Sequence, residues 1–261
     1  MTRRDSPILL KEHALLDHAR EDEAHGNLRG AEALYLRGRV LARQLPPEDY
    51  HVETDILRAL ANVHIKEKQL EHAETVYEER LALLLSRRKG IDLDIGIALF
   101  DLEVLYDGVG RQQEAERMIE RATQFYNECK GDQNLATTCD RRLAYVQGFQ
   151  GVFLFEHQRS REAEPYLRIV AARPDQGLRP ALLESALIAL AAIRSRSGDL
   201  EEAIQLARRF AIAKQVPRGG ADSATEGRAW PSARFSKQPL NYSGRVSRCN
   251  MRALPPRLPL S

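Results

Sequence analysis

The sequence predicts an all-α protein, a right-handed superhelix of about five stacked helix pairs. One segment recurs five times along the chain, and apolar residues around each copy lie three and four positions apart, as on one face of a helix. Leu, Ala, Glu and Arg dominate the composition and aromatic residues make up only 6% of it, which favours helices. A single helix pair cannot bury its apolar face alone, so the copies are expected to stack into one domain.

The recurring segment is a turn, then an alanine that is followed by Glu in four of the five copies. The alanines are spaced 42, 42, 48 and 40 residues apart, at Ala31, Ala73, Ala115, Ala163 and Ala203. Four positions later come Tyr35, Tyr77, Ile119, Leu167 and Ala207. A small residue lets two antiparallel helices approach closely, and a large one a turn away fills the groove between them. We expect Gly26, Gly110 and Gly198 to end the first helix of their pairs.

The expected repeat domain covers residues 9–215 and precedes a different kind of segment at 216–261. Its repeats lie near 11–45, 52–90, 93–130, 134–174 and 179–214. The helix pairs are predicted near 9–25 with 28–44, 52–67 with 70–87, 93–108 with 111–128, 134–156 with 160–173, and 179–197 with 200–214. Proline, glycine and aspartate mark the linkers. The 48-residue spacing indicates an insertion around residues 130–150.

These residues resemble the tetratricopeptide repeat (TPR) family, which has a small residue in its first helix, a glycine near the turn and an alanine in its second helix. The usual period is 34 residues, whereas a period near 42 resembles the kinesin light chain subclass. The segments His72-Ala73-Glu74-Thr75-Val76-Tyr77 and Glu162-Ala163-Glu164-Pro165-Tyr166-Leu167 are similar to that subclass. The resemblance covers residues 11–214 and implies a solenoid that binds proteins. Gln150 and Arg194 depart from the pattern, where the family has bulky apolar residues.

In such a solenoid the first helices line a concave groove that can hold a peptide. Arg58, Asn62 and Lys66 share one face at positions i, i+4 and i+8, and Arg20 is the equivalent of Asn62 in the first repeat. Guanidinium, ammonium and amide groups suit an acidic peptide or a C-terminal carboxylate. The set is similar to part of the carboxylate clamp of chaperone-binding TPR proteins. The alternative is an ordinary solvated face of charged side chains.

An apolar strip is expected farther along the same groove. It consists of Phe100, Val104, Val152, Phe155 and Ile188. An exposed strip of this kind would form a pocket for the side chains of a partner. If the helical register is one residue off, the same side chains belong to the core instead. The sequence leaves both interpretations open.

The segment 216–261 holds eight Lys and Arg against two acidic residues, a net charge of +6, whereas residues 1–215 carry −4. It contains six of the twelve prolines, four glycines and six serines, without an apolar period, and is predicted to be a disordered tail. Such a tail could bind nucleic acid or another anionic surface, with an affinity that falls with salt. Because no nucleic-acid-binding module accompanies it, a protein partner is the favoured hypothesis. The change in composition would also fit a misjoined reading frame.

Several functions lack the residues that they need. No apolar stretch is long enough to span a bilayer, and His13 and His18 point about 140° apart on a helix, so no metal site is predicted. Gly108-Val109-Gly110-Arg111 lacks the Lys-Ser/Thr of a phosphate loop, and no catalytic triad or carboxylate pair is evident. We therefore expect a non-enzymatic adaptor without a cofactor. It could also associate with itself through the uncapped last repeat.

The three cysteines are Cys129, Cys139 and Cys249, an odd number without a CxxC pair. This usage is typical of a reducing compartment and predicts a cytoplasmic protein. Cys129 and Cys139 flank a short loop and could approach each other, but buried reduced thiols are the favoured interpretation.

Overall fold

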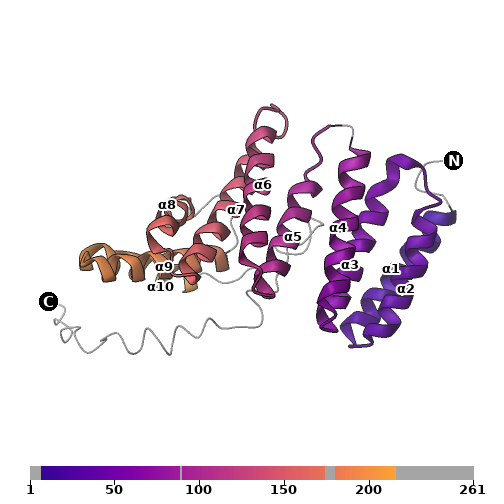
Figure 1. Ribbon diagram of the computed structural model, residues 1–261, viewed down its shortest axis with the longest axis horizontal. Coiled ribbons are helices and arrows are strands. Elements are labelled where there is room, and N and C mark those ends of the chain that lie inside the picture. Colours follow the sequence, from indigo (N-terminus) through magenta and orange to yellow (C-terminus); the bar gives the residue numbers. More distant parts are fainter. Residues whose placement is uncertain (1–6, 89, 174–179, 216–261) are drawn as a thin grey trace. The chain divides into compact units, whose positions relative to one another are not determined.

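The computed structural model describes residues 7–88, 90–173 and 180–215, which belong to one compact unit. Within these ranges the chain forms ten α-helices and a short 3-10 helix, and no strand (Figure 1). The helices are α1 (Pro7–Ala24), α2 (Leu28–Ala42), η2 (Pro47–Asp49), α3 (Tyr50–Lys66), α4 (Leu70–Arg87), α5 (Asp94–Gly108), α6 (Gln112–Cys129), α7 (Ala136–Glu156), α8 (Ser160–Ala171), α9 (Pro180–Ser197) and α10 (Leu200–Gln215). The predicted disordered tail lies outside the described residues.

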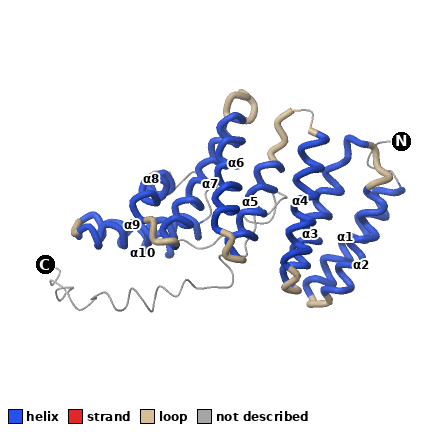
Figure 2. Tube along the Cα trace, in the orientation of Figure 1, coloured by secondary structure: helices blue, strands red, loops and turns tan. Residues whose placement is uncertain are grey.

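The helices pack as five consecutive pairs, α1 with α2 through α9 with α10. The second helix of each pair also packs against the first helix of the next pair. Short turns separate the two helices of every pair (Figure 2). The five predicted helix pairs are confirmed, and the ends of the helices differ from the predicted ends by a few residues at most.

The turn within each pair has the same backbone conformation in all five copies. Its central residue is left-handed, with φ of 81° at Gly26, 79° at Gly110 and 88° at Gly198, as the glycines predicted. Lys68 and Gln158 hold the same position with φ of 63° and 65° although they are not glycines. The next backbone N–H donates to a carbonyl five residues back, as in Arg111 N to Tyr106 O at 2.8 Å. All five turns therefore share one backbone conformation, although only three of them have a glycine at this position.

The insertion between repeats three and four lies in a helix. α7 has 21 residues, six more than the 15 of α5, and this difference equals the extra six residues of the 48-residue spacing. The link from α6 to α7 is as long as the link from α4 to α5. The insertion therefore lengthens the first helix of repeat four and leaves its connection unchanged.

The alanines of the repeat lie where the helices of a pair approach most closely. Ala31, Ala73, Ala115 and Ala163 are completely buried, and Ala203 is nearly so. Gly151 plays the matching role on α7, since a Cβ there would come within 2.9 Å of Leu167 Cγ on α8. The small residues thus set the distance between paired helices, as the sequence predicted.

Cys129 and Cys139 are joined by a disulfide, with their Cα atoms 5.9 Å apart. The expectation of two reduced thiols is therefore wrong. The connection after α6 brings the first turn of α7 back against the last residue of α6, and the resulting Cα separation suits a disulfide. The cysteines consequently no longer argue for a reducing compartment, and the cytoplasmic location stays a prediction.

Candidate functional site

The candidate site is the first-helix wall, which we define as the surface of α1, α3, α5, α7 and α9. These helices contact one another directly as well as their own partners. Lys66 Nζ on α3 donates to Glu23 Oε1 on α1 at 2.6 Å, and the Arg196 guanidinium on α9 lies 5.7 Å from the ring centroid of Phe155 on α7. Side chains from consecutive repeats therefore form one continuous surface.

Three of the predicted groove residues keep polar groups at this surface. Arg20 is exposed and pairs with Asp17 on its own helix, at 2.9 Å. Lys66 is exposed beside Glu23. Asn62 is partly buried, and its Oδ1 accepts a hydrogen bond from Tyr77 Oη at 2.8 Å, which leaves the amide N–H groups for another acceptor. The ion pair between Arg20 and Asp17 is exposed on both sides, and such pairs are weak.

Arg58 has a different role from the one that the sequence suggested. Its Nε and Nη2 donate to the two oxygens of Asp101 at 2.9 and 3.2 Å. Asp101 is completely buried and also accepts from Arg80 Nη1 at 2.9 Å, while Arg80 Nε donates to the carbonyl of Thr54. Arg58 is therefore engaged in the core between α3 and α5 and does not offer its charge to a partner.

The Arg80 side chain is completely buried as well. Burial lowers the pKa of its guanidinium, and the charge of Asp101 opposes that shift. Burial and the charge of Asp101 also raise the pKa of Tyr77. Sequence reasoning missed Arg80 and Asp101, although a signal for Arg80 was present: it falls on the apolar stripe of α4, between Tyr77 and Leu84.

The predicted apolar strip divides between core and surface. Phe100, Val152 and Phe155 are 1%, 6% and 7% exposed. These three residues therefore belong to the core, which is the second of the two interpretations that the sequence left open. The ring of Phe100 packs edge-on against Phe149, with centroids 4.5 Å apart. Of these five residues, Val104 and Ile188 remain partly exposed. Val104 and Ile188 are thus the accessible part of the predicted strip on the first-helix wall.

Three glutamates that follow a repeat alanine, Glu74, Glu116 and Glu164, form ion pairs with the next repeat. Arg111 Nη1, at the turn of repeat three, donates to both oxygens of Glu74 at 2.8 and 2.7 Å. Arg159 pairs with Glu116 in the same manner, and Arg194 with Glu164. The departure at Arg194 is thereby explained, because its guanidinium reaches the glutamate of the preceding repeat. Sequence reasoning found this Ala-Glu signature without assigning a role to the glutamate.

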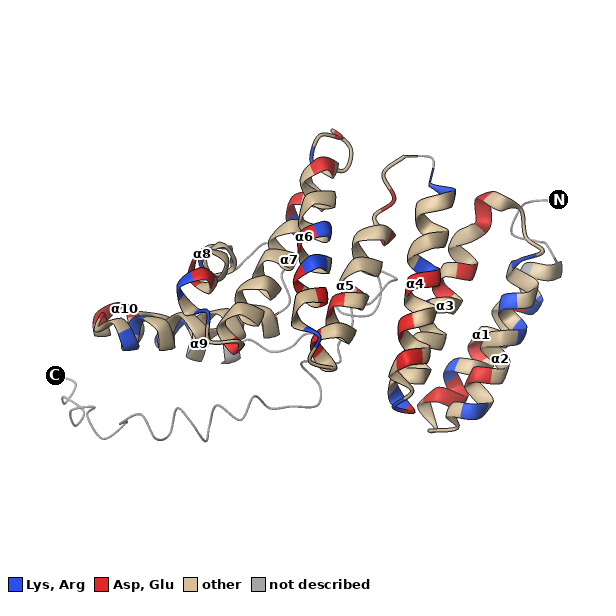
Figure 3. Cartoon of the chain, viewed as in Figure 1, with Lys and Arg blue, Asp and Glu red and all other residues tan. Residues whose placement is uncertain are grey.

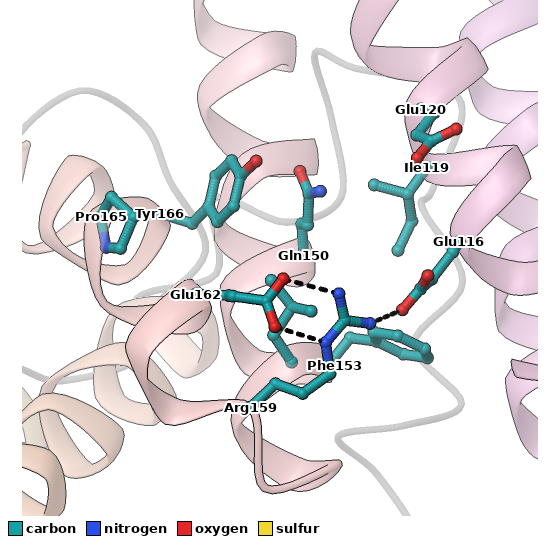
Figure 4. Close-up of a pocket in the computed structure, with 10 residues that line it drawn as sticks. Glu116, Ile119, Glu120, Gln150, Phe153, Arg159, Glu162, Pro165 and Tyr166 are labelled. Atoms are coloured by element: carbon teal, nitrogen blue, oxygen red, sulfur yellow. Dashed lines mark hydrogen bonds and ion pairs between the residues drawn. The ribbon is translucent and has the colours of Figure 1, made fainter. Parts of the chain in front are cut away.

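A cleft of about 390 Å³ opens between α6 and α8, with α7 as its floor. Figure 4 shows the Arg159 guanidinium reaching between Glu162 and Glu116 at one end of it. Its lining residues are Glu116, Ile119, Glu120, Gln150, Phe153, Leu154, Arg159, Glu162, Pro165 and Tyr166. Gln150, the other departure from the family pattern, therefore faces this cleft.

One carboxylate of the cleft is held in its ionised form by a neighbouring arginine. Arg159 donates to Glu162 through two nitrogens, at 2.8 and 2.7 Å, and these hydrogen bonds lower the pKa of that carboxyl group. A carboxylate held in its ionised form is a poor proton donor near neutral pH. The arrangement suits the holding of charged groups better than proton transfer.

The second helices of the pairs carry charge of both signs, as α4 and α6 illustrate (Figure 3). None of the described helices combines the length and the hydropathy that a bilayer span requires.

No protein-family model matches the chain, and no curated protein matches it. The structure is similar to that of BtubC (BKLC) from P. vanneervenii, with a TM-score of 0.62 and 18% identity over 86% of this chain and 98% of that one. It is also similar to a putative kinesin light chain of Podosopora anserina with nearly identical TPR-like repeats. That similarity has a TM-score of 0.55 and 15% identity over 80% of this chain and 97% of that one.

The five stacked helix pairs define the fold as a tetratricopeptide-repeat α-solenoid, as predicted. One of the two similar structures is that of a putative kinesin light chain, and the period of about 42 residues in this chain is the one that the sequence analysis compared with that subclass. The similarity at 15–18% identity concerns the fold.

Proposed function

We propose that this chain is a non-enzymatic scaffold whose first-helix wall binds an extended segment of a partner protein. The observation that carries the proposal is the direct contact between first helices of consecutive repeats, which makes one surface from α1 to α9. Solenoids use such extended surfaces to bind peptides. The side chains that would contact the partner are those that remain accessible: Arg20, Asn62, Lys66, Val104 and Ile188.

The chemistry of these residues indicates the kind of segment. Arg20 and Lys66 are cationic, and Asn62 has amide donors left over. A carboxylate of the partner, from an acidic side chain or a C-terminus, would accept hydrogen bonds from them. Val104 and Ile188 would cover an apolar side chain farther along the segment. Arg58, Phe100, Val152 and Phe155 would support the wall from beneath.

Charge reversal at the accessible cations tests the proposal. The full chain, the double variant Arg20→Glu/Lys66→Glu and the control Arg37→Glu/Arg161→Glu are used as baits in cell lysate, and retained proteins are quantified by mass spectrometry. The control reverses two exposed charges on the second helices α2 and α8. We expect a protein that the wild type and the control retain and the Arg20/Lys66 variant loses.

A protein that all three baits retain equally would exclude the basic part of the wall as the binding site. If the control loses it and the Arg20/Lys66 variant keeps it, the second helices are the binding surface. Arg58 is left unchanged because its reversal would break the contact with Asp101 and disturb the fold.

Self-association is a second candidate function, favoured by the last helix. Leu200, Ile204 and Ile212 of α10 are 61%, 45% and 65% exposed. An apolar face of this kind is a common place for contact between protein chains. Light scattering of the wild type beside Ile204→Lys/Ile212→Lys tests whether the chain associates through α10. A dimer that persists in the variant would exclude this face as the dimer interface. Binding of nucleic acid by the basic tail concerns residues outside the described ranges and stays a prediction.

A further inference from the structure

Three potential metal ligands from two repeats meet beside the start of α3 and α5. His51 is the second residue of α3, Asp92 lies just before α5, and Asp94 is its first residue. His51 Nδ1 is 3.3 Å from Asp94 Oδ2 and 3.9 Å from Asp92 Oδ2. The three ligand atoms all lie within 4.8 Å of one another.

The carboxylate of Asp92 is held in place by neighbouring groups. Asp92 Oδ1 accepts a hydrogen bond from the backbone N–H of Asp94 at 3.0 Å, and its Oδ2 accepts one from Tyr50 Oη at 2.6 Å. The side chains of Asp92 and Asp94 are 10% and 5% exposed. Hydrogen bonds to a ligating carboxylate are what orients it at a metal site. Asp92 is therefore oriented before any ion binds.

A simple ion pair between histidine and aspartate explains the geometry less well. Nδ1 of His51 is shielded from solvent and makes no hydrogen bond, although Asp94 Oδ2 lies 3.3 Å away. A protonated imidazole that paired with Asp94 would direct its N–H at the oxygen. A shielded imidazole nitrogen that lies close to two carboxylates without such a hydrogen bond can offer its lone pair to an ion.

The distances suit a small divalent ion. With bonds of about 2.0–2.1 Å, a tetrahedral ion holds neighbouring ligand atoms roughly 3.3 Å apart. The separation between His51 Nδ1 and Asp94 Oδ2 has this value, and Asp92 Oδ2, 3.9 Å from the same nitrogen, is the third ligand atom. An imidazole nitrogen beside carboxylates favours Zn²⁺ and similar transition ions over Mg²⁺ and Ca²⁺, which prefer oxygen ligands only.

We propose that His51, Asp92 and Asp94 form a binding site for a divalent transition ion of the Zn²⁺ class, with water as the remaining ligand. The ion would link repeat two, through α3, to repeat three, through the start of α5. Because its ligands are 41 and 43 residues apart in the sequence, it would bind the folded chain only and would stabilise this joint. No motif within one helix predicts the site, because its ligands come from two repeats.

Zinc titration of the full chain tests this proposal. All samples carry Cys249→Ser, so that a free thiol does not bind zinc, and are treated with EDTA and dialysed. Isothermal titration with ZnCl2 measures the affinity and the number of ions bound. We expect one ion per wild-type chain, and a 10–100-fold loss of affinity in His51→Ala and in Asp92→Asn. The matched control His18→Ala removes an exposed histidine of α1 and should bind like the wild type.

A second measurement separates binding from folding. Zinc should raise the melting temperature of the wild type and of His18→Ala but not that of His51→Ala, while MgCl2 should raise none of them. The proposal is overturned if the wild type binds no zinc, or if His51→Ala and Asp92→Asn bind it as tightly as the wild type. If His51→Ala loses helical circular dichroism without zinc, this variant is misfolded, and the zinc affinity of Asp92→Asn alone tests the proposal.

Discussion

Helix α5 contacts both repeat two and repeat four. Two adjacent residues make these contacts, and they do so through different kinds of interaction. Asp101 faces repeat two and accepts hydrogen bonds from Arg58 and Arg80. Phe100 faces repeat four and packs against the rings of Phe149 and Tyr145, with centroids 4.5 and 6.0 Å away. Because twelve of the fifteen residues of α5 are buried, both joints are shielded from water. We call the cluster of Asp101, Arg58 and Arg80 the charged joint, and the cluster of Phe100, Phe149 and Tyr145 the aromatic joint.

The two joints contribute differently to the stability of the fold and to the choice of neighbouring repeat. In the charged joint the attraction between ions has to offset the cost of removing them from water, so the net gain is small while a broken pair is costly. In the aromatic joint the burial of apolar surface stabilises the contact directly, and ring geometry adds to it. We infer that the charged joint determines which repeats are neighbours, whereas the aromatic joint supplies more of the stability.

The largest effect is expected from Asp101→Ala. The substitution leaves two buried guanidinium groups without their common carboxylate, and the free energy of unfolding should fall by about 3–5 kcal/mol. Urea denaturation followed by circular dichroism measures it. The combined variant Arg58→Met/Arg80→Leu/Asp101→Leu removes all three charges and should recover most of the loss. A single variant within about 1 kcal/mol of the wild type would show that the charges are hydrated or paired elsewhere.

A loss nearly as large is expected from Phe149→Ala in the aromatic joint. Removing a buried ring leaves a cavity, which should lower the free energy of unfolding by about 3–4 kcal/mol. The same denaturation measurement applies, with Phe149→Leu as the matched control that retains most of the volume and should lose far less. If both variants lose equally, ring geometry rather than volume stabilises this joint.

The turns that end α5 and α3 should respond to substitution with opposite signs. Gly110→Ala places a side chain on a left-handed residue and should destabilise the protein by about 1 kcal/mol, whereas Lys68→Gly relieves the same strain and should stabilise it by less than that. Thermal melts of the two variants beside the wild type measure both shifts. Melting temperatures that move in the same direction would exclude backbone strain as the cause.

The smallest effect concerns a buried acid in repeat one. Glu12 is completely buried, its carboxylate makes no hydrogen bond, and burial raises its pKa. A raised pKa in the folded state means that stability is fully present below the ordinary value of 4.5 and is lost as the pH rises through the folded pKa. Glu12→Gln should therefore stabilise the protein at pH 7.5 by on the order of 1 kcal/mol and leave it unchanged near pH 4. Melting temperatures at both pH values test this, and an equal gain at both would exclude ionisation as the cause.

The repeat itself was predictable because its signals are local. The turn glycines, the alanine of the second helix and the apolar residue a turn later recur at regular intervals, and each acts within one helix pair. The helix pairs and the left-handed turns followed from them. The extra six residues before repeat four were also visible in the spacing, although their place inside α7 was not.

The candidate site was predictable only in part, because register decides which face of a helix is buried. Arg58 and Lys66 lie two turns apart on α3 and share a face, yet Arg58 is bound to Asp101 and Lys66 is exposed. Phe100 and Val104 share a face of α5 in the same way, and only Val104 reaches the surface. Partners on neighbouring repeats made this difference, and they lie more than 40 residues away.

By itself, the sequence determined the repeat, its period, the helix pairs and the small residues that let them pack, since all of these depend on contacts within about 40 residues. Only the tertiary structure decided the charged joint, the cleft over α7 and the meeting of His51 with Asp92 and Asp94. The physical reason is that stacking brings equivalent positions of neighbouring repeats together. Whether two side chains then meet depends on the rotation of each helix, which no local pattern specifies.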